Sequence, residues 1–331
     1  MDIKSLSKKI SYHNIRYKLK RLIFKMGEND FYPQLPKSKY SFLTNYQRYK
    51  FWNSLARKHK QFKYFYQKNP GEYFEKYLPI SKNHKYYVNF KKFYEDGVAE
   101  IENFFNNEEH QLILNFFKSN TIKNLESVKK QNVICKDENI NQLIFNKTKI
   151  LEKILFGKYF KKQNYNFQSI LKNKNESSIF GTSANFHPDR FIPSIKLIYF
   201  PTDVKIDPFE YALGSHIINE NFEQNILIEF ENEKKIGKLI REQIKLNRET
   251  GQNMDPKLLD ETNQNQYNFN FKSYRVKKFY SKANTLLIVA THGLHRRSQT
   301  FEKDNYGIRN NLTISYYNEF TRFDLLKKLY N

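Results

Sequence analysis

The sequence is poor in residues that cross-link a chain or turn it sharply. Its one cysteine, Cys135, excludes an internal disulfide and any zinc site built from cysteines. We expect Cys135 to be a small buried apolar residue. Glycine and proline are also sparse, with 10 and 9 copies in 331 residues, while Lys, Asn, Ile, Phe and Tyr are abundant. An AT-rich genome would produce the same skew.

Long apolar runs are missing as well. No stretch of 18 or more apolar residues occurs, so the sequence predicts no membrane-spanning helix. The N-terminus lacks the apolar stretch of a signal peptide. Cytoplasmic residence is therefore expected. Apolar residues make up 39% and aromatic residues 17%, far more aromatics than a disordered chain carries. This length allows one sizeable core with an appendage, or two small domains.

Positive charge dominates and is unevenly spread. The formal net charge is +23, and residues 1–90 hold 20 Lys and Arg against 5 Asp and Glu. Such a charge indicates an anionic partner: nucleic acid, an anionic membrane surface or a phosphorylated substrate. The genomic skew explains it equally well. The charge shift and the turn-prone stretch 81–84 predict a basic, mostly helical extension over 1–88, followed by the main domain over 89–331.

Two helices are expected inside the basic extension. The first is amphipathic, with its apolar residues at helical spacing and Lys and Arg over much of the rest; the apolar positions are Ile15, Leu19, Leu22, Ile23 and Met26. It could lie on an anionic membrane, giving peripheral membrane contact, but packing against the main domain is the favoured interpretation. The second helix is the aromatic-rich stretch 42–67, whose rings we expect in a core rather than on nucleic-acid bases. No obligate protein partner is predicted.

The main domain is rich in short strand patterns. A helix is expected at 107–118 and another at 228–246, the latter within a polar insertion at 217–282. Strands are expected after Gly97 up to 104, in a strand–turn–strand unit at 184–200, and at 284–290 and 309–317. The predicted fold class is therefore mainly β with flanking helices (α+β), arranged as a sandwich or jelly roll.

The residues with metal-binding chemistry cluster in this domain. In His187-Pro188-Asp189, the imidazole and the carboxylate are two residues apart, so on an extended strand both point to one face. A third ligand has to come from a distant strand. A buried strand at 284–290 ends just before His292 and His295, either of which could supply it. Two histidines and one carboxylate form the facial triad of non-haem Fe(II) oxygenases, which leaves three metal positions open.

Downstream, Arg309 stands at the start of a strand. Its planar guanidinium suits bidentate binding of a carboxylate. Arg296 and Arg297 could meet an anionic substrate, although neighbouring arginines are also common on surfaces.

Several blocks, in order, resemble the phytanoyl-CoA dioxygenase family of Fe(II)/2-oxoglutarate-dependent oxygenases. They are the aromatic–glycine–apolar segment 94–104, Phe-His-Pro-Asp at 186–189, Pro-Phe-Glu-Tyr-Ala-Leu-Gly-Ser-His at 208–216, the strand and histidines of 284–297, and Arg309. The resemblance covers about 93–320. Three departures stand out: Pro188 in the metal motif, Leu213 in place of a proline, and a longer loop at 298–306.

The resemblance implies a double-stranded β-helix (jelly roll, cupin-like) core, iron held by His187, Asp189 and His295, and hydroxylation coupled to conversion of 2-oxoglutarate and O₂ to succinate and CO₂. His295 is preferred to His292 because the family's spacing from strand to histidine, and the glycine before it, fit His295. Arg309 would bind 2-oxoglutarate, and Gln168 and Asn173 are further candidates for contacting it or the substrate.

His216 is expected to be structural, bonding a backbone group. The presence of Asp189 argues against a halogenase relative, in which a small residue would leave room for chloride.

Two other functions stay open at this stage. One is a basic protein that binds nucleic acid or a membrane surface on a jelly-roll scaffold with a vestigial metal site. The other is a cupin-like metal hydrolase using the same three ligands. The substrate, whether small molecule, lipid-linked or CoA-linked, is not readable from the sequence.

Overall fold

The computed structural model describes residues 69–77, 80–120, 130–133, 135–155, 161–172, 186–189, 194–228, 272–298 and 307–317, together with Gln67. All of them belong to one compact unit of the chain, formed by 45–232 and 255–331. The helices predicted at 15–26 and 42–67, the loop at 298–306, Asn173 and nearly all of the helix predicted at 228–246 lie outside the described residues.

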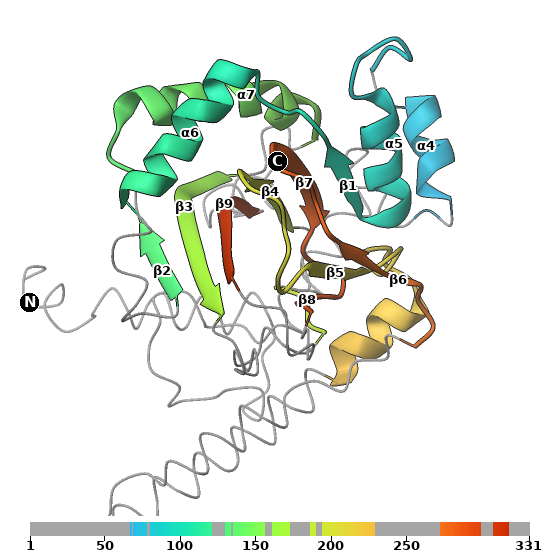
Figure 1. The fold of residues 1–331 in the computed structure, drawn as a ribbon. Coiled ribbons are helices and arrows are strands. Elements are labelled where there is room, and N and C mark those ends of the chain that lie inside the picture. Colours follow the sequence, from blue (N-terminus) through green and yellow to red (C-terminus); the bar gives the residue numbers. More distant parts are fainter. Residues whose placement is uncertain are drawn as a thin grey trace, which may run out of the picture. The chain divides into compact units, whose positions relative to one another are not determined.

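A large antiparallel sheet forms the centre of this unit (Figure 1). Its strands, in spatial order, are β1 (Val98–Ile101), β7 (Thr285–Ala290), β4 (Ser194–Phe200), β9 (Gly307–Tyr317), β3 (Lys161–Lys172) and β2 (Lys130–Val133). Strands far apart in the chain thus lie side by side, because β4 pairs with both β7 and β9.

A smaller antiparallel sheet contains β6 (Val276–Phe279), β5 (Phe209–Ala212) and β8 (His295–Arg297), with β5 in the middle. On the outer side of β8, His187 forms an isolated antiparallel bridge to His295. The segment 186–189 therefore runs along the small sheet as a fourth, minimal strand.

Alternation along the strands gives the large sheet two different faces. In β4, Leu197 packs into the main core with the helices, whereas Ile198 packs into a second cluster shared with the small sheet. The second cluster joins residues of both sheets, such as Leu287 of β7 and Phe209 of β5. Since successive strand residues point to opposite faces, this pattern places the small sheet on one face of the large sheet and the helices on the other.

The helices are α4 (Pro70–Tyr77), α5 (Tyr87–Asp96), α6 (Asn107–Asn120) and α7 (Glu138–Leu155), with a further helical segment at 220–228. Side chains cap two of them. Asn106 and Glu109 bond each other's backbone N–H groups at the start of α6, and Asp137 accepts bonds from the first turn of α7. Gly97 ends α5 in the left-handed conformation, with φ of 83°.

The predicted class, mainly β with flanking helices, is confirmed. The strands expected after Gly97, at 284–290 and at 309–317 are present as β1, β7 and β9, and the helix expected at 107–118 is α6. No prediction was made for α7, β3, α4 or α5. The domain boundary predicted near residue 88 falls inside α5, and the division of the chain at that point stays a prediction.

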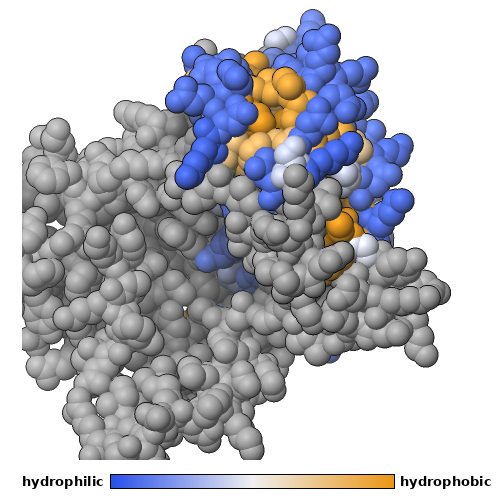
Figure 2. Space-filling view, turned by 60° about the vertical axis from the view of Figure 1, so that its left-hand side comes forward, coloured by the Kyte–Doolittle hydropathy of each residue, from blue (hydrophilic) through white to orange (hydrophobic). Residues whose placement is uncertain are grey.

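On the face shown in Figure 2, the visible described residues are mostly hydrophilic and surround a limited apolar area. The exposed apolar residues of α6 and α7 include Leu112, Phe145 and Ile150. Among the described helices, none is long and apolar enough to cross a membrane. Cys135 is buried in the main core, as expected.

Candidate metal site

The bridge between segment 186–189 and β8 positions two of the predicted ligands. His187 and His295 exchange backbone hydrogen bonds, each N–H donating to the other's carbonyl at 3.0 Å, and the N–H of Asp189 donates to the Thr291 carbonyl at 2.8 Å. In such a ladder the backbone nitrogen of residue 188 points away from the partner strand, so an N–H at this position would not pair with β8. The proline therefore removes no pairing hydrogen bond, and the motif tolerates it.

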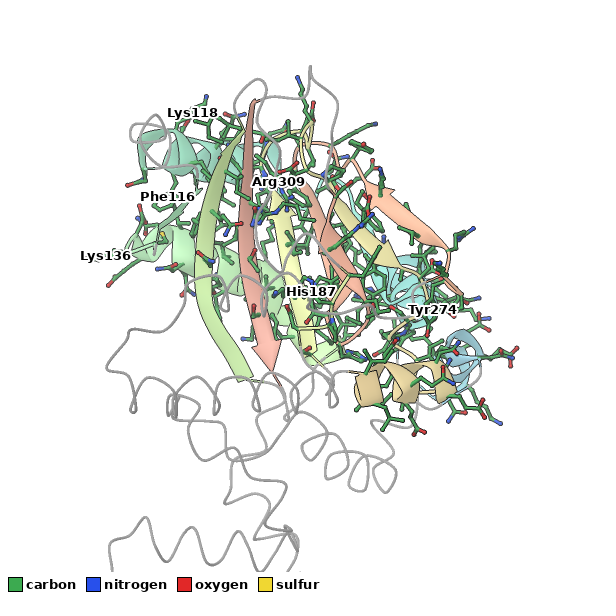
Figure 3. The ribbon with its side chains drawn as sticks, turned by 90° about the horizontal axis from the view of Figure 1, so that it is seen from below. Phe116, Lys118, Lys136, His187, Tyr274 and Arg309 are labelled. Carbon is green, nitrogen blue, oxygen red and sulfur yellow. The ribbon has the colours of Figure 1, made fainter. Side chains whose placement is uncertain are left out.

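His187, Asp189 and His295 come together at one point. One nitrogen or oxygen from each lies within 4.8 Å of the others, as in a set that could hold one metal ion. Asp189 Oδ1 is 3.6 Å from His295 Nε2. That separation is long for a hydrogen bond but close to the roughly 3–4 Å expected between two ligands that are each about 2.1 Å from one metal. His187 lies toward the middle of the sheets in Figure 3.

The ring of His295 is held in the orientation that a ligand needs. Its Nδ1 lies 3.0 Å from the Gly293 carbonyl, so Nδ1–H donates there and leaves the Nε2 lone pair free to bind a metal. Phe209 and Tyr211 of β5 flank the ring, the latter nearly parallel at 11°. The His187 ring stands beside it, with the two centroids 4.8 Å apart.

Asp189 carries a negative charge that the surrounding groups stabilise. Burial alone would raise the pKa of this carboxyl, but the charge of Lys196 and the contact with His295 hold its pKa well below the usual range. Lys196 Nζ is 2.7 Å from Asp189 Oδ2. The carboxylate is thus available as a ligand across the whole ordinary pH range. Sequence reasoning missed Lys196. The signal was its place in the strand two residues before Ile198, which puts both side chains on the same interior face of β4.

Arg309 lies on the interior face of β9 and is 6% exposed (Figure 3). Its Nη1 donates to the Asp207 carbonyl, its guanidinium lies 5.6 Å from the Phe200 ring centroid, and its Nε is buried without a hydrogen-bond partner among the described residues. Burial, with Arg297 nearby, lowers the pKa of Arg309 to about 9. A buried cation with an unused donor is suited to an anionic ligand.

Gln168 and Asn173 are the other residues predicted to contact 2-oxoglutarate or the substrate. Gln168 of β3 is directly opposite Asn311 of β9, and Ile170 is opposite Arg309, so Gln168 and Arg309 share one face of the large sheet. Asn311 Oδ1 is buried and has no hydrogen-bond partner among the described residues. Asn173 lies outside the described residues, and its role stays a prediction.

His292 is not part of the metal cluster. It is 1% exposed, and its Nδ1 lies 3.4 Å from the backbone of Ser194. Burial lowers its pKa to about 3, so it stays neutral near pH 7. The turn after β7 folds inward and packs His292 near His216 and Phe222, so His292 is a buried neighbour of the candidate site.

His216 is structural, as predicted. Its Nε2 is 2.9 Å from the Tyr94 carbonyl, which joins the turn after β5 to α5. Burial lowers its pKa to about 4. The neighbouring Ser215 Oγ accepts a hydrogen bond at 2.7 Å from the N–H of Leu294, just before the candidate ligand His295.

Arg296 and Arg297 face different surroundings. Arg296 Nε donates to Glu210, a fully buried carboxylate, and its guanidinium lies 4.5 Å from the Phe186 ring centroid. Burial alone would raise the pKa of Glu210, but hydrogen bonds from Ser298 and Arg296 and the charge of Lys278 lower it. Arg296 therefore joins β8 to β5. Arg297 faces inward near Arg309.

No protein-family model matches this sequence, and a search of curated proteins gives no match. Similar solved structures include HygX from Streptomyces hygroscopicus with iron bound (13% identity, TM-score 0.40, covering 73% of this chain and 88% of that one). They also include SnoK, a non-heme alpha ketoglutarate dependent carbocyclase from nogalamycin biosynthesis (10% identity, TM-score 0.42, covering 72% of this chain and 84% of that one). A third is AviO1 from Streptomyces viridochromogenes (10% identity, TM-score 0.41, covering 73% of this chain and 98% of that one). Because these TM-scores are below 0.5, the function has to be read from this chain's own side chains.

Proposed function

We propose that the protein is an Fe(II)- and 2-oxoglutarate-dependent oxygenase that hydroxylates a small-molecule, lipid-linked or CoA-linked substrate. The observation that carries this proposal is the convergence of His187, Asp189 and His295 within 4.8 Å in the interior between two sheets. Two imidazoles and one carboxylate suit a divalent iron ion and leave three positions for other ligands.

The strand order supports the double-stranded β-helix of the phytanoyl-CoA dioxygenase family as the core fold. Along the chain, β3, β4, β7 and β9 of the large sheet alternate with elements of the small sheet, namely segment 186–189, the consecutive pair β5 and β6, and β8. This alternation places the metal motif and β8 at one edge of the small sheet. Both metal-binding elements thereby open toward the same interior as Arg309.

The protein residues hold and orient the reactants. His187, Asp189 and His295 would bind the iron, and Arg309 would pair with a carboxylate of 2-oxoglutarate through its planar guanidinium. Bound iron would supply the oxidising chemistry that couples hydroxylation to the conversion of 2-oxoglutarate and O₂ to succinate and CO₂. Phe200 and Phe209, on facing strands, keep the interior apolar around these polar groups.

An anaerobic titration tests the proposal. Metal-free protein receives Fe(II) and then 2-oxoglutarate, and the weak visible charge-transfer band of the chelate is followed. We expect the band only when both are present and expect it to vanish in His187→Ala. In Arg309→Met the band should require about tenfold or more 2-oxoglutarate, while the Fe(II) affinity stays unchanged.

A wild-type protein that binds Fe(II) but never develops the band with 2-oxoglutarate would contradict the proposal. Turnover without oxygen consumption would instead favour a metal hydrolase built on the same ligands. Circular dichroism of His187→Ala and Arg309→Met separates loss of binding from loss of fold.

A further inference from the structure

Lys196 is the one charged residue of β4, and it stands near the centre of the large sheet. Its strand neighbours are Val289 of β7 and Ser315 of β9. It shares a face with Ile198, which packs toward the small sheet. Its side chain is 23% exposed. An isolated lysine among the apolar residues of a central strand is costly unless its charge is used.

The charge of Lys196 is directed at one oxygen of one metal ligand. Its Nζ lies 2.7 Å from Asp189 Oδ2, while the other oxygen, Oδ1, faces His295 Nε2 at 3.6 Å. Among the described residues, no ion pair other than that with Lys196 is formed by Oδ2. The two oxygens of Asp189 therefore have different partners: Oδ1 faces His295 and Oδ2 is paired with Lys196.

This division has a consequence for metal binding. A carboxylate can bind a cation through one oxygen or through both. An octahedral metal held by three single-atom ligands keeps three positions open, and a chelating co-substrate together with O₂ needs all three. If Oδ2 also turned to the metal, one of those positions would close. A lysine ammonium holding Oδ2 prevents this.

The second consequence is electrostatic. Asp189 and Lys196 together are neutral, so the site with a divalent ion carries the full charge of two. A more positive site attracts an anionic chelator more strongly and a bare cation less strongly. The open coordination position and the more positive charge therefore both favour binding of a chelating, anionic co-substrate.

We propose that Lys196 is a positioning residue: it restricts Asp189 to one metal-binding oxygen and biases the loaded site toward a chelating, anionic co-substrate such as a 2-oxo acid. This inference rests on the proposed function and names a residue that the triad itself does not include. The competing explanation is that Lys196 only neutralises Asp189 and supports the fold.

The two explanations differ in which affinity changes on substitution. We would measure Ni(II) binding to metal-free protein, and then 2-oxoglutarate binding to the Ni(II)-loaded protein, both by calorimetry so that no turnover is needed. In Lys196→Met we expect the 2-oxoglutarate Kd to rise about tenfold or more, while Ni(II) binds as tightly as in the wild type or more tightly. Lys196→Arg, which keeps the charge and the donors, should recover most of the 2-oxoglutarate affinity.

Lys277→Met is the matched control. Lys277 is also a strand lysine paired with a carboxylate, at 3.1 Å from Glu100, but that pair lies on β6 and β1. Both affinities should match the wild type. If circular dichroism shows Lys196→Met to be unfolded, Lys196→Gln replaces it as a neutral side chain of similar length.

A Lys196→Met protein with weakened Ni(II) binding and an unchanged 2-oxoglutarate Kd would overturn the proposal in favour of a supporting role. Unchanged affinities for both would overturn it as well. A wild-type protein that binds Ni(II) but no 2-oxoglutarate would instead overturn the proposed function, and this inference with it.

Discussion

Side chains near the metal site are each oriented by a specific contact. His295 is oriented by the Gly293 carbonyl, Asp189 by Lys196, and His216 by the Tyr94 carbonyl. Each partner comes from another strand, turn or helix, except Gly293, which lies in the same turn. A candidate ligand side chain that is already oriented by a second contact needs little rearrangement when a metal binds, which favours tight binding.

The burial of His216 makes the stability of the protein depend on pH. Its pKa is about 4 in the folded protein against 6.5 for an ordinary histidine. Between these values the unfolded chain takes up a proton that the folded one refuses. The stability contributed by neutral His216 is therefore complete above about pH 6.5 and is lost progressively as the pH falls toward 4.

We expect His216→Gln to lose less stability than the wild type when the pH drops from 7.5 to 5.5. The difference should be about 1 kcal/mol in the free energy of unfolding, measured with urea at both pH values. The glutamine keeps a donor for the Tyr94 carbonyl. Equal losses in both proteins would mean that His216 titrates alike in the folded and unfolded states.

At the scale of elements, β5, the end of α5 and the turn between β7 and β8 pack closely against one another around the hydroxyl of Tyr211. Tyr211 of β5 donates its hydroxyl hydrogen to the Ala290 carbonyl at the end of β7. The same hydroxyl touches Gly293, which precedes the ligand strand β8, and a Cβ on Gly97 would stand 2.5 Å from it. Glycine is thus required where α5 and the turn before β8 approach Tyr211.

Gly293→Ala should disturb the metal site through the backbone. Its Cβ would overlap the Tyr211 hydroxyl and come within 2.9 Å of Ser215 Oγ, so the turn that carries His295 has to shift. We expect a loss of about 2–4 kcal/mol in stability and a weaker Ni(II) affinity. Calorimetry and urea unfolding measure the two quantities.

Tyr211→Phe provides the matching test, because it removes the nearest clashing atom. Alone it should cost about 1 kcal/mol through the lost hydrogen bond, but in the Gly293→Ala background it should cost less or restore stability. Gly71→Ala is the control, since the three atoms nearest to its Cβ would all belong to the exposed, movable side chain of Glu95. Strictly additive effects of Gly293→Ala and Tyr211→Phe would refute the proposed clash.

At the scale of the whole molecule, α4 and α5 are packed against the body of the fold. Phe74 of α4 is 1% exposed, stacks on Tyr94 of α5 at 5.2 Å, and belongs to the main core cluster. Helix α5 continues directly through Gly97 into β1, an edge strand of the large sheet. Part of the segment predicted to be an extension thus shares the core.

Phe74→Ala should therefore lower the free energy of unfolding of the full chain by about 3–5 kcal/mol. Leu112→Ala, at a side chain that is 57% exposed, should change it by no more than about 0.5 kcal/mol. Urea unfolding of both variants gives the comparison. A small effect of Phe74→Ala would mean that α4 is only loosely attached, as an extension ending near residue 88 would require.

The predicted anionic partner belongs to the same scale. It depends on the charge of residues 1–90, most of which lie outside the described part of the chain. Contact with an anionic membrane or nucleic acid stays a prediction.

The sequence alone determined the local patterns and the ligand types. The alternation in 284–290 and 309–317 and the spacing of His187 and Asp189 depend only on strand geometry, in which every second residue shares a face. These patterns were sufficient to predict β7, β9 and a His-x-Asp pair on one face. They left His292 and His295 as alternatives until the family resemblance favoured one.

The tertiary structure decided which distant residues meet. The bridge from His187 to His295 and the burial of His292 beside His216 and Phe222 join segments far apart in the sequence. The contact between Lys196 and Asp189 is closer in sequence, but it depends on how segment 186–189 packs in the folded chain. Helix α7 went unpredicted although its buried residues Ile140, Ile144, Leu151 and Leu155 recur at helical spacing. Strand β3 has a mixed polar pattern and is stabilised by pairing with β2 and β9. Pairing between strands is a property of the folded chain, so no single segment could have predicted these contacts.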